Sequence, residues 1–249
     1  MTRRRILITG ASAGLGAEMA RQFAARGRDL ALCARRTDNL HALRDELAGA
    51  HPDIRISVRA LDVDDHAAVE RVFGEFRTEF DGLDRVIVNA GLGKGAPVGS
   101  GRARANIATA TTNFVSALAQ AEAALEIFRG QNAGHLVLIS SMSAVRGLPG
   151  KKAAYSASKA GLSTLGEGLA IELRRSPIAV TTVQPGFIAT EMSARADDAR
   201  LVVPLERGVA AMVAAIEAEP VRACVPQWPW RALNLVLPRL PRSVMARLG

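Results

Sequence analysis

Two side chains capable of acid–base chemistry stand four positions apart after a loop rich in glycine and serine. Tyr155 and Lys159 would lie on one face of a helix, because positions i and i+4 of a helix are neighbours. Upstream, the apolar run 136–139 has the character of a buried strand, and Ser141 and Ser143 follow it. A phenol, an ammonium and a hydroxyl would then meet at a strand end, which suits proton transfer. Taken alone, such a pair is also common on solvated helix faces.

A glycine-rich turn near the N-terminus has the pattern of a phosphate-binding loop. The apolar run 5–9 stops at a Gly-x-x-x-Gly-x-Gly sequence, and an amphipathic segment follows. In such a strand–turn–helix unit the backbone approaches a pyrophosphate closely, and the free N–H groups of the helix point at it. An ordinary turn with spare glycines is the alternative. The residues we expect to form the cradle are Gly10, Ser12, Ala13, Gly14, Leu15 and Gly16.

The second strand-like run, 30–33, closes without an acidic residue that could bind the 2′-hydroxyl of NAD. Ala34 takes that place, and Arg35 and Arg36 follow it. Guanidinium groups match a phosphate in charge and in fork geometry. The sequence therefore predicts NADP(H) as the cofactor, with Arg35 as the main ligand of the 2′-phosphate and Arg36 as its support. Solvated loop arginines are the alternative.

The succession of motifs resembles the short-chain dehydrogenase/reductase family. The resemblance runs from Thr9 to about Thr190, and it combines a Thr-Gly-x-x-x-Gly-x-Gly loop with the Tyr-x-x-x-Lys pair. Further matches are Asp62 and Val63, Asn89, Ala90 and Gly91, Asn113, and Pro185 and Gly186. In the family the first pair contacts the adenine, Asn113 bends a helix and holds a water of the proton relay, and Ile188 and Thr190 contact the carboxamide end of the nicotinamide.

The resemblance implies catalytic roles for four residues. Tyr155 would exchange a proton with the substrate oxygen, and Lys159 would hold the nicotinamide ribose. A free phenol has a pKa of about 10, and we expect the Lys159 cation to lower it. A serine would bind the substrate oxygen, but the usual family spacing lands on Met142. We favour Ser141 over Ser143 because Ser141 directly follows the strand end.

The resemblance implies an α/β fold, a Rossmann-type doubly wound parallel sheet of about seven strands in a single domain, 1–249. The segment 54–59 alternates apolar and polar residues, so we place it at a sheet edge. One long helix is expected over 102–129. A substrate lid is expected at about 187–206, and an apolar, basic tail at about 227–249.

Composition restricts the partners. The net charge of +8 comes from scattered arginines, and aromatic residues make up only 4% of the chain, so nucleic acid is not an expected partner. Two distant cysteines predict no disulfide framework, and no apolar stretch reaches the roughly 20 residues of a membrane span. We therefore expect a cytoplasmic protein. The four histidines show no metal-ligand spacing, so no metal is expected.

The predicted function is NADP(H)-dependent interconversion of a ketone or aldehyde and an alcohol, acting on a small molecule. Two alternatives stay open, namely a nucleotide-sugar epimerase or dehydratase and a catalytically silent cofactor-sensing protein. The resemblance implies a dimer or tetramer paired through the helices of Asn113 and Tyr155. The small residues expected to let these helices pack closely are Ala117, Ala121, Ala157 and Ala160.

The tail has three possible roles. It could pack over the substrate site or a dimer interface, lie on a membrane surface, or remain disordered. Pro238 and Pro241 prevent one long amphipathic helix, which disfavours the membrane.

Overall fold

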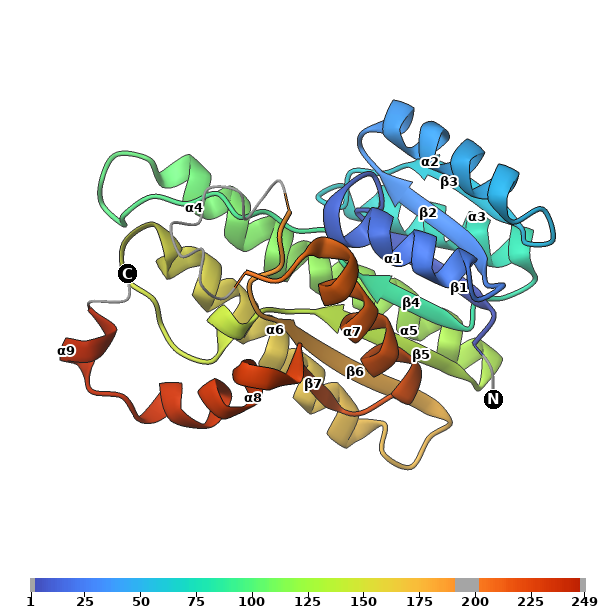
Figure 1. Cartoon of the computed structure of the whole chain (residues 1–249). Helices are drawn as coiled ribbons and strands as arrows, with labels where there is room; N and C mark the ends of the chain where they lie inside the picture. The colour runs from blue at the N-terminus through green and yellow to red at the C-terminus, as the bar shows by residue number, and fades with distance from the viewer. Residues whose placement is uncertain (1–2, 191–201, 247–249) are drawn as a thin grey trace.

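A seven-stranded parallel sheet in the order β3-β2-β1-β4-β5-β6-β7 forms the centre of the protein (Figure 1). The computed structural model describes residues 3–190 and 202–246. The predicted α/β, Rossmann-type fold in a single domain is confirmed. The strands are β1 (Arg5–Thr9), β2 (Asp29–Ala34), β3 (Ile56–Ala60), β4 (Arg85–Val88), β5 (Gly134–Ile139), β6 (Ile178–Pro185) and β7 (Arg222–Val225).

Helices cover both faces of the sheet. The apolar side chains of α3, α5 and α6 form one core layer, and those of α1, α2 and α7 form the other. The helices are α1 (Gly14–Ala24), α2 (Thr37–Ala50), α3 (His66–Phe80), α4 (Ala103–Ala110), α5 (Ser116–Gln131), α6 (Ala153–Glu172), α7 (Leu205–Ala218), α8 (Gln227–Val236) and α9 (Arg242–Met245). None of the helices in the described ranges is long and apolar enough to cross a membrane.

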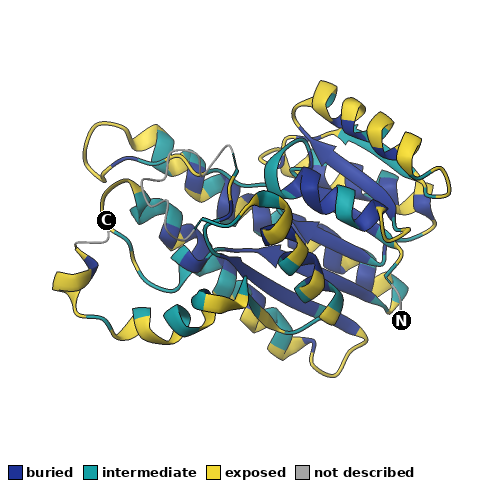
Figure 2. Cartoon of the chain, viewed as in Figure 1, coloured by how far each residue is buried: buried dark blue, intermediate teal, exposed yellow. Residues whose placement is uncertain are grey.

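The burial of each strand follows its sequence. All six residues of β2 are buried, as its continuous apolar run requires in the middle of a parallel sheet. β3 is only partly buried and lies at the edge of the sheet, so the edge position predicted from its alternation is confirmed. Figure 2 shows the buried central strands in dark blue and the exposed outer faces of the helices in yellow.

The helix predicted over 102–129 is interrupted. Between α4 and α5, the residues Thr111–Val115 form a π-helical turn. One extra residue in a turn of this kind re-aims the side chains that follow it. The turn contains Asn113, whose side chain is fully buried.

Two of the small residues expected to support subunit pairing point into the core of the chain itself. Ala117 and Ala121 on α5 are 1% exposed and pack in the core beneath the sheet. On α6, Ala157 is exposed and Ala160 is partly buried. The expectation that all four let helices pack across subunits is therefore wrong for Ala117 and Ala121, because their face of α5 is already used by the chain's own core.

The C-terminal segment folds back on the body. Trp230 on α8 is 4% exposed, and the guanidinium of Arg146 donates hydrogen bonds to the backbone carbonyls of Pro238 and Leu240. The lid predicted at 187–206 falls mostly outside the described residues, which leave out 191–201. On its two sides, Ile188 and Val203 form a parallel β-bridge.

An ionic network lies at the amino-terminal edge of the sheet. Arg85, at the start of β4, is fully buried. Its Nε donates to Nδ1 of His135 at 2.9 Å, and its two terminal nitrogens reach the carboxylates of Glu217 at 2.8 Å and Glu219 at 3.3 Å. Burial and the Arg85 cation lower the pKa of His135 to about 3. His135 is therefore neutral at physiological pH, which leaves Nδ1 free to accept.

Candidate active site

The glycine turn after β1 is tightly folded. A Cβ on Gly16 would lie 2.3 Å from the carbonyl oxygen of Gly10, and Gly14 has a φ of +53°. A side chain at position 16 would therefore collide with backbone, and one at position 14 would be strained. α1 begins at Gly14, and Ala13 before it supplies no side-chain cap, so the first N–H groups of the helix remain for a ligand.

The two arginines after β2 lie near this turn. Arg36 Nε donates to Oγ of Ser12 at 3.3 Å. The exposed Arg35 has a terminal nitrogen 3.8 Å from the carboxylate of Asp62, which follows β3. Val63 beside Asp62 is buried. The structure thus brings together four residues that the sequence assigned to the adenosine end of a cofactor.

The motif after β4 is held to the end of β1. The Thr9 hydroxyl accepts from the backbone N–H groups of Asn89 at 3.1 Å and of Ala90 at 3.2 Å. The Asn89 amide donates to the Thr9 carbonyl at 2.9 Å. A Cβ on Gly10 would lie 2.9 Å from Cα of Ala90, so these two loops are in direct contact.

Asn113 joins the π-helical turn to the loop after β4. Its Oδ1 accepts from the backbone N–H of Leu92 at 2.7 Å, and its Nδ2 donates to the Leu92 carbonyl at 2.9 Å. Nδ2 also reaches Oγ of Ser158 at 3.3 Å. A Cβ on Gly91 would lie 3.0 Å from Asn113 Oδ1 and 3.5 Å from Lys159 Nζ. Asn113 is therefore buried within the site, with both atoms of its amide hydrogen-bonded.

Ser141 and Tyr155 meet at the end of β5. Their hydroxyl groups are hydrogen-bonded to each other. Ser141 Oγ also accepts from the backbone N–H of Ser143 at 3.0 Å, which fixes its direction. Met142 has a buried side chain. The structure therefore places Ser141, the serine favoured from the sequence, next to the phenol.

Lys159 is buried on the same helix as Tyr155, and its ammonium donates to the Ile139 carbonyl at 2.8 Å. Burial lowers the pKa of Lys159 to about 8. Burial also raises the pKa of Tyr155, and the hydrogen bond with Ser141 offsets only part of that rise. The expected lowering of the phenol pKa by the Lys159 cation is therefore wrong for this structure, because desolvation dominates both groups.

The segment that begins with Pro185 and Gly186 at the end of β6 packs against α8 and α7. Gly186 faces the indole of Trp230, and a Cβ there would lie 2.1 Å from the ring. Ile188 is 4% exposed, and its side chain packs against Gly208 of α7, so only its backbone can face a ligand. Thr190 lies near the glycine turn, 3.7 Å from where a Cβ on Gly14 would be.

Sequence reasoning missed three supports of this site. Ser158 holds Asn113, the Thr9 hydroxyl joins two strand ends, and Trp230 closes the space under Gly186. The position of Ser158 one residue before Lys159 gave no signal, and Trp230 is distant in sequence. Thr9 is the first residue of the glycine-loop motif that the sequence analysis quoted, so the role of its hydroxyl is the one of the three that could have been predicted.

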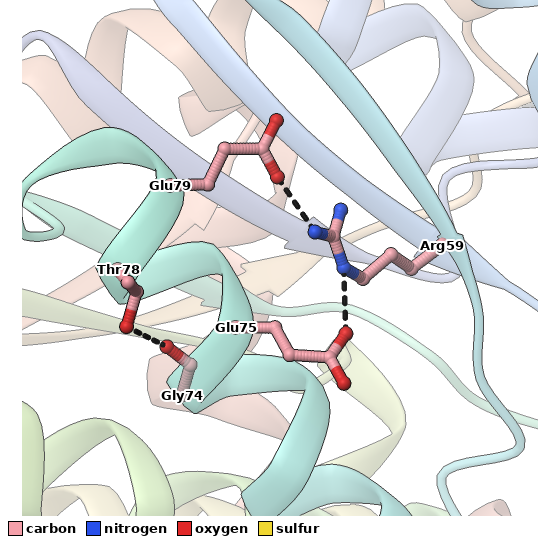
Figure 3. Close-up of a pocket in the computed structure, with 5 residues that line it drawn as sticks. All are labelled: Arg59, Gly74, Glu75, Thr78 and Glu79. Atoms are coloured by element: carbon pink, nitrogen blue, oxygen red, sulfur yellow. Dashed lines mark hydrogen bonds and ion pairs between the residues drawn. The ribbon is translucent and has the colours of Figure 1, made fainter.

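A surface depression between β3 and α3 is unrelated to this cluster. Figure 3 shows Arg59 pointing across it to the carboxylates of Glu75 and Glu79. The distances are 2.8 and 2.7 Å, and Arg71 also pairs with Glu75 at 2.9 Å, so both carboxylates of the depression already have cationic partners. In the described part of the chain, no group of three histidine, cysteine or acidic side chains is arranged to hold a metal ion.

Comparisons with known proteins agree with this geometry. A family model described as short chain dehydrogenase matches residues 4–201. An uncharacterized oxidoreductase of Mycobacterium tuberculosis (strain ATCC 25618 / H37Rv) is 57% identical over 249 residues, which cover 100% of this chain and 98% of the relative. The chain belongs to the short-chain dehydrogenase/reductase family, whose members are oxidoreductases that use NAD(P)(H).

Two solved structures have the same fold. The crystal structure of levodione reductase superposes with a TM-score of 0.81 at 26% identity, over 90% of this chain and 96% of the other. An NADPH-dependent 3-quinuclidinone reductase from Rhodotorula rubra superposes with a TM-score of 0.80 at 26% identity, over 89% of this chain and 88% of the other.

Proposed function

We propose that this oxidoreductase interconverts a ketone or aldehyde and an alcohol with NADP(H), using Tyr155 as the general acid and base. The observation that carries the proposal is the hydrogen-bonded pair of hydroxyls, Ser141 and Tyr155, with Lys159 one helical turn away. Two hydroxyls side by side can both donate to one carbonyl oxygen. Such donors stabilise the charge that develops on that oxygen during reduction.

The residues present fit a dinucleotide. The turn after β1 is tight and carries no side chain at Gly10, Gly14 or Gly16, so a ligand can approach its backbone. The uncapped start of α1 offers N–H donors to a pyrophosphate. The arginines after β2 would hold a 2′-phosphate, and Lys159 would hold ribose hydroxyls. When bound, the cofactor supplies or accepts a hydride at its nicotinamide ring.

Tyr155 donates and accepts the proton in the proposed reaction. Because burial raises its pKa, the phenol keeps its proton at neutral pH and is in the state needed to donate to a developing alkoxide. Ser141 would hold the substrate oxygen within reach of the phenol. Asn113 and Lys159, which both lie beside Gly91, would complete a relay that returns a proton to the phenol.

A panel of ketones and aldehydes, followed by the loss of NADPH absorbance, tests the proposed activity. We expect substrate-dependent oxidation of NADPH that a Tyr155→Phe variant lacks. NADPH binding without turnover across the panel would favour the catalytically silent cofactor-sensing protein. The two similar structures are named as reductases of levodione and of 3-quinuclidinone, and the second is named as NADPH-dependent. Ketones are therefore the first substrates to test.

Ser141→Ala is expected to lower kcat by about a hundredfold or more, the usual effect of removing one donor to a developing oxyanion. Ser143→Ala is the matched control. It keeps the backbone N–H that orients Ser141 Oγ, so its kcat should stay near the wild-type value. A large fall for Ser143→Ala with a near-normal Ser141→Ala would reverse the assignment.

Arg35→Ser is expected to raise KM for NADPH by about ten- to a hundredfold, since a hydrogen bond to a charged group contributes about 1.5–3 kcal/mol. KM for NADH should change little, because NADH has no 2′-phosphate. Arg44→Ser, which removes a partly buried arginine paired with Asp45 on α2, is the control. Equal changes for both cofactors, or a wild-type preference for NADH, would contradict the NADP(H) assignment.

A further inference from the structure

The outer side of the C-terminal segment exposes large apolar side chains. Trp228 is 79% exposed, Leu235 64%, Val236 51% and Val244 41%. In Figure 1, α8 and α9 extend past the sheet, and Figure 2 shows much of their surface as exposed. We call the region of these four side chains the α8–α9 surface.

Packing of the same segment explains why these side chains face outward. Trp230 fills the space under Gly186 and stacks edge-on against Phe187 at 5.3 Å between ring centres. Asn234 donates to Sγ of Cys224 at 3.2 Å, which attaches α8 to β7. Met245 is buried on α9. The inner side is therefore used by the fold, and the α8–α9 surface is left without a covering element in the described residues.

Charge distinguishes this segment from the rest of the chain. From Pro220 to Gly249 the sequence has five arginines and no aspartate or glutamate. Arg231, Arg239 and Arg242 are exposed among the apolar side chains. Arg231 and Leu235 are four positions apart on α8, so a cation and an apolar group share one helix face.

These features fit one kind of partner best. A second copy of this surface, related by a two-fold axis, would bring arginines against arginines with no acid to pair them. A nucleic acid would satisfy the arginines but would leave isolated aliphatic side chains in water. An anionic lipid surface satisfies both, because its headgroups attract basic side chains and its interfacial layer accepts tryptophan, leucine and valine.

We propose that the α8–α9 surface binds the surface of membranes that contain anionic lipids. Pro238 and Pro241 rule out one long amphipathic helix, but a peripheral contact needs only exposed apolar and basic side chains on short helices that the body of the protein holds in place. The contact is independent of the reaction, since none of these side chains belongs to the candidate active site.

Co-sedimentation with vesicles tests the proposal directly. The whole protein is mixed at low salt with vesicles of equal parts phosphatidylglycerol and phosphatidylcholine, and separately with phosphatidylcholine alone. We expect binding to the first and little to the second. The binding should weaken as salt is added, because screening reduces the attraction between arginines and headgroups.

Two double variants separate the contributions. Each basic side chain near an anionic surface contributes about 1 kcal/mol, which is about fivefold in the partition coefficient. Arg239→Gln with Arg242→Gln should therefore reduce the partition coefficient about 25-fold. Trp228→Ser with Leu235→Ser should reduce it by about tenfold or more, because apolar surface no longer leaves water. Ile171→Ser with Arg175→Gln, exposed residues elsewhere on the molecule, is the matched control and should bind as the wild type does.

Fluorescence adds a readout that sedimentation lacks. The chain has two tryptophans, and only Trp228 is exposed, so its emission should shift to shorter wavelength on vesicles and the shift should vanish in Trp228→Phe. No sedimentation with anionic vesicles would overturn the proposal, and so would equal losses in the control and test variants. NADPH oxidation by the variants should stay at the wild-type rate, which separates failure of this proposal from failure of the proposed function.

Discussion

Replacing Tyr155 by phenylalanine is expected to lower kcat by roughly 10²- to 10⁴-fold, the usual contribution of a positioned general acid. The substitution removes one oxygen and keeps the aromatic ring. The helix that carries Lys159 should therefore stay intact, and NADPH should bind with nearly unchanged affinity. Steady-state rates with the best carbonyl substrate measure the first effect, and quenching of tryptophan emission by NADPH measures the second.

The outcome distinguishes the proposed reaction from its rivals. Residual turnover close to that of the wild type would show that another group moves the proton. Loss of NADPH binding together with activity would mean that the hydroxyl serves the cofactor and not the substrate. Ser156→Ala is a useful control, since Ser156 neighbours Tyr155 on α6. Among the described residues its hydroxyl bonds the backbone groups of Ala153 and Leu148.

Arg85→Met is expected to lower the free energy of unfolding by about 2–4 kcal/mol. The methionine fills much of the volume but leaves His135 Nδ1 and the Ile216 carbonyl without their donor. It also removes one of the two cations paired with each of Glu217 and Glu219, which keep Arg28 and Arg3 respectively. Breaking a fully buried pair costs about 3–5 kcal/mol. The effect should be smaller here, because the Glu217 and Glu219 side chains remain 29% and 26% exposed. Urea unfolding followed by circular dichroism measures it.

Two further variants test the cause. Arg85→Met with Glu217→Gln should lose less than the sum of the two single variants, since the pair between Arg85 and Glu217 is already broken in the first. Arg129→Met removes an exposed ion pair with Glu172 and should cost less than about 1 kcal/mol. If Arg85→Met does not fold, Arg85→Lys keeps the charge and should show a smaller loss in the same direction. Equal losses for Arg85→Met and Arg129→Met would contradict a structural role for the network.

The sheet and the identity of the reactive side chains could be predicted because they depend on local pattern. Continuous apolar runs such as 136–139 give buried parallel strands, and the alternation over 54–59 gives an edge. Tyr155 and Lys159 share a helix face by spacing alone. The choice of Ser141 over Ser143 followed from its position at the strand end, and its hydrogen bond with Tyr155 supports that choice.

Features that depend on contacts between distant parts of the chain could not be predicted. A bend at Asn113 was expected from the family resemblance alone, and its π-helical form arises where the Asn113 amide reaches Leu92, which no helix propensity encodes. The pKa values of Tyr155 and Lys159 follow from how deeply the fold buries them, so reasoning from their spacing gave the wrong direction for the phenol. The inward packing of Ala117 required knowledge of which face of α5 meets the sheet.

The contact between Trp230 and Gly186 has a consequence for the timing of assembly during synthesis. β7 pairs only with β6 in the described sheet, and the indole that supports Gly186 comes after β7. The turn after β1 and the arginines after β2 do not depend on β7 or α8, but α1, which follows the turn, packs in one core layer with α7. A nascent chain released through α7 could therefore complete its adenosine half while its nicotinamide half still lacks α8, so a partly synthesised chain could hold a nucleotide before it could perform any chemistry.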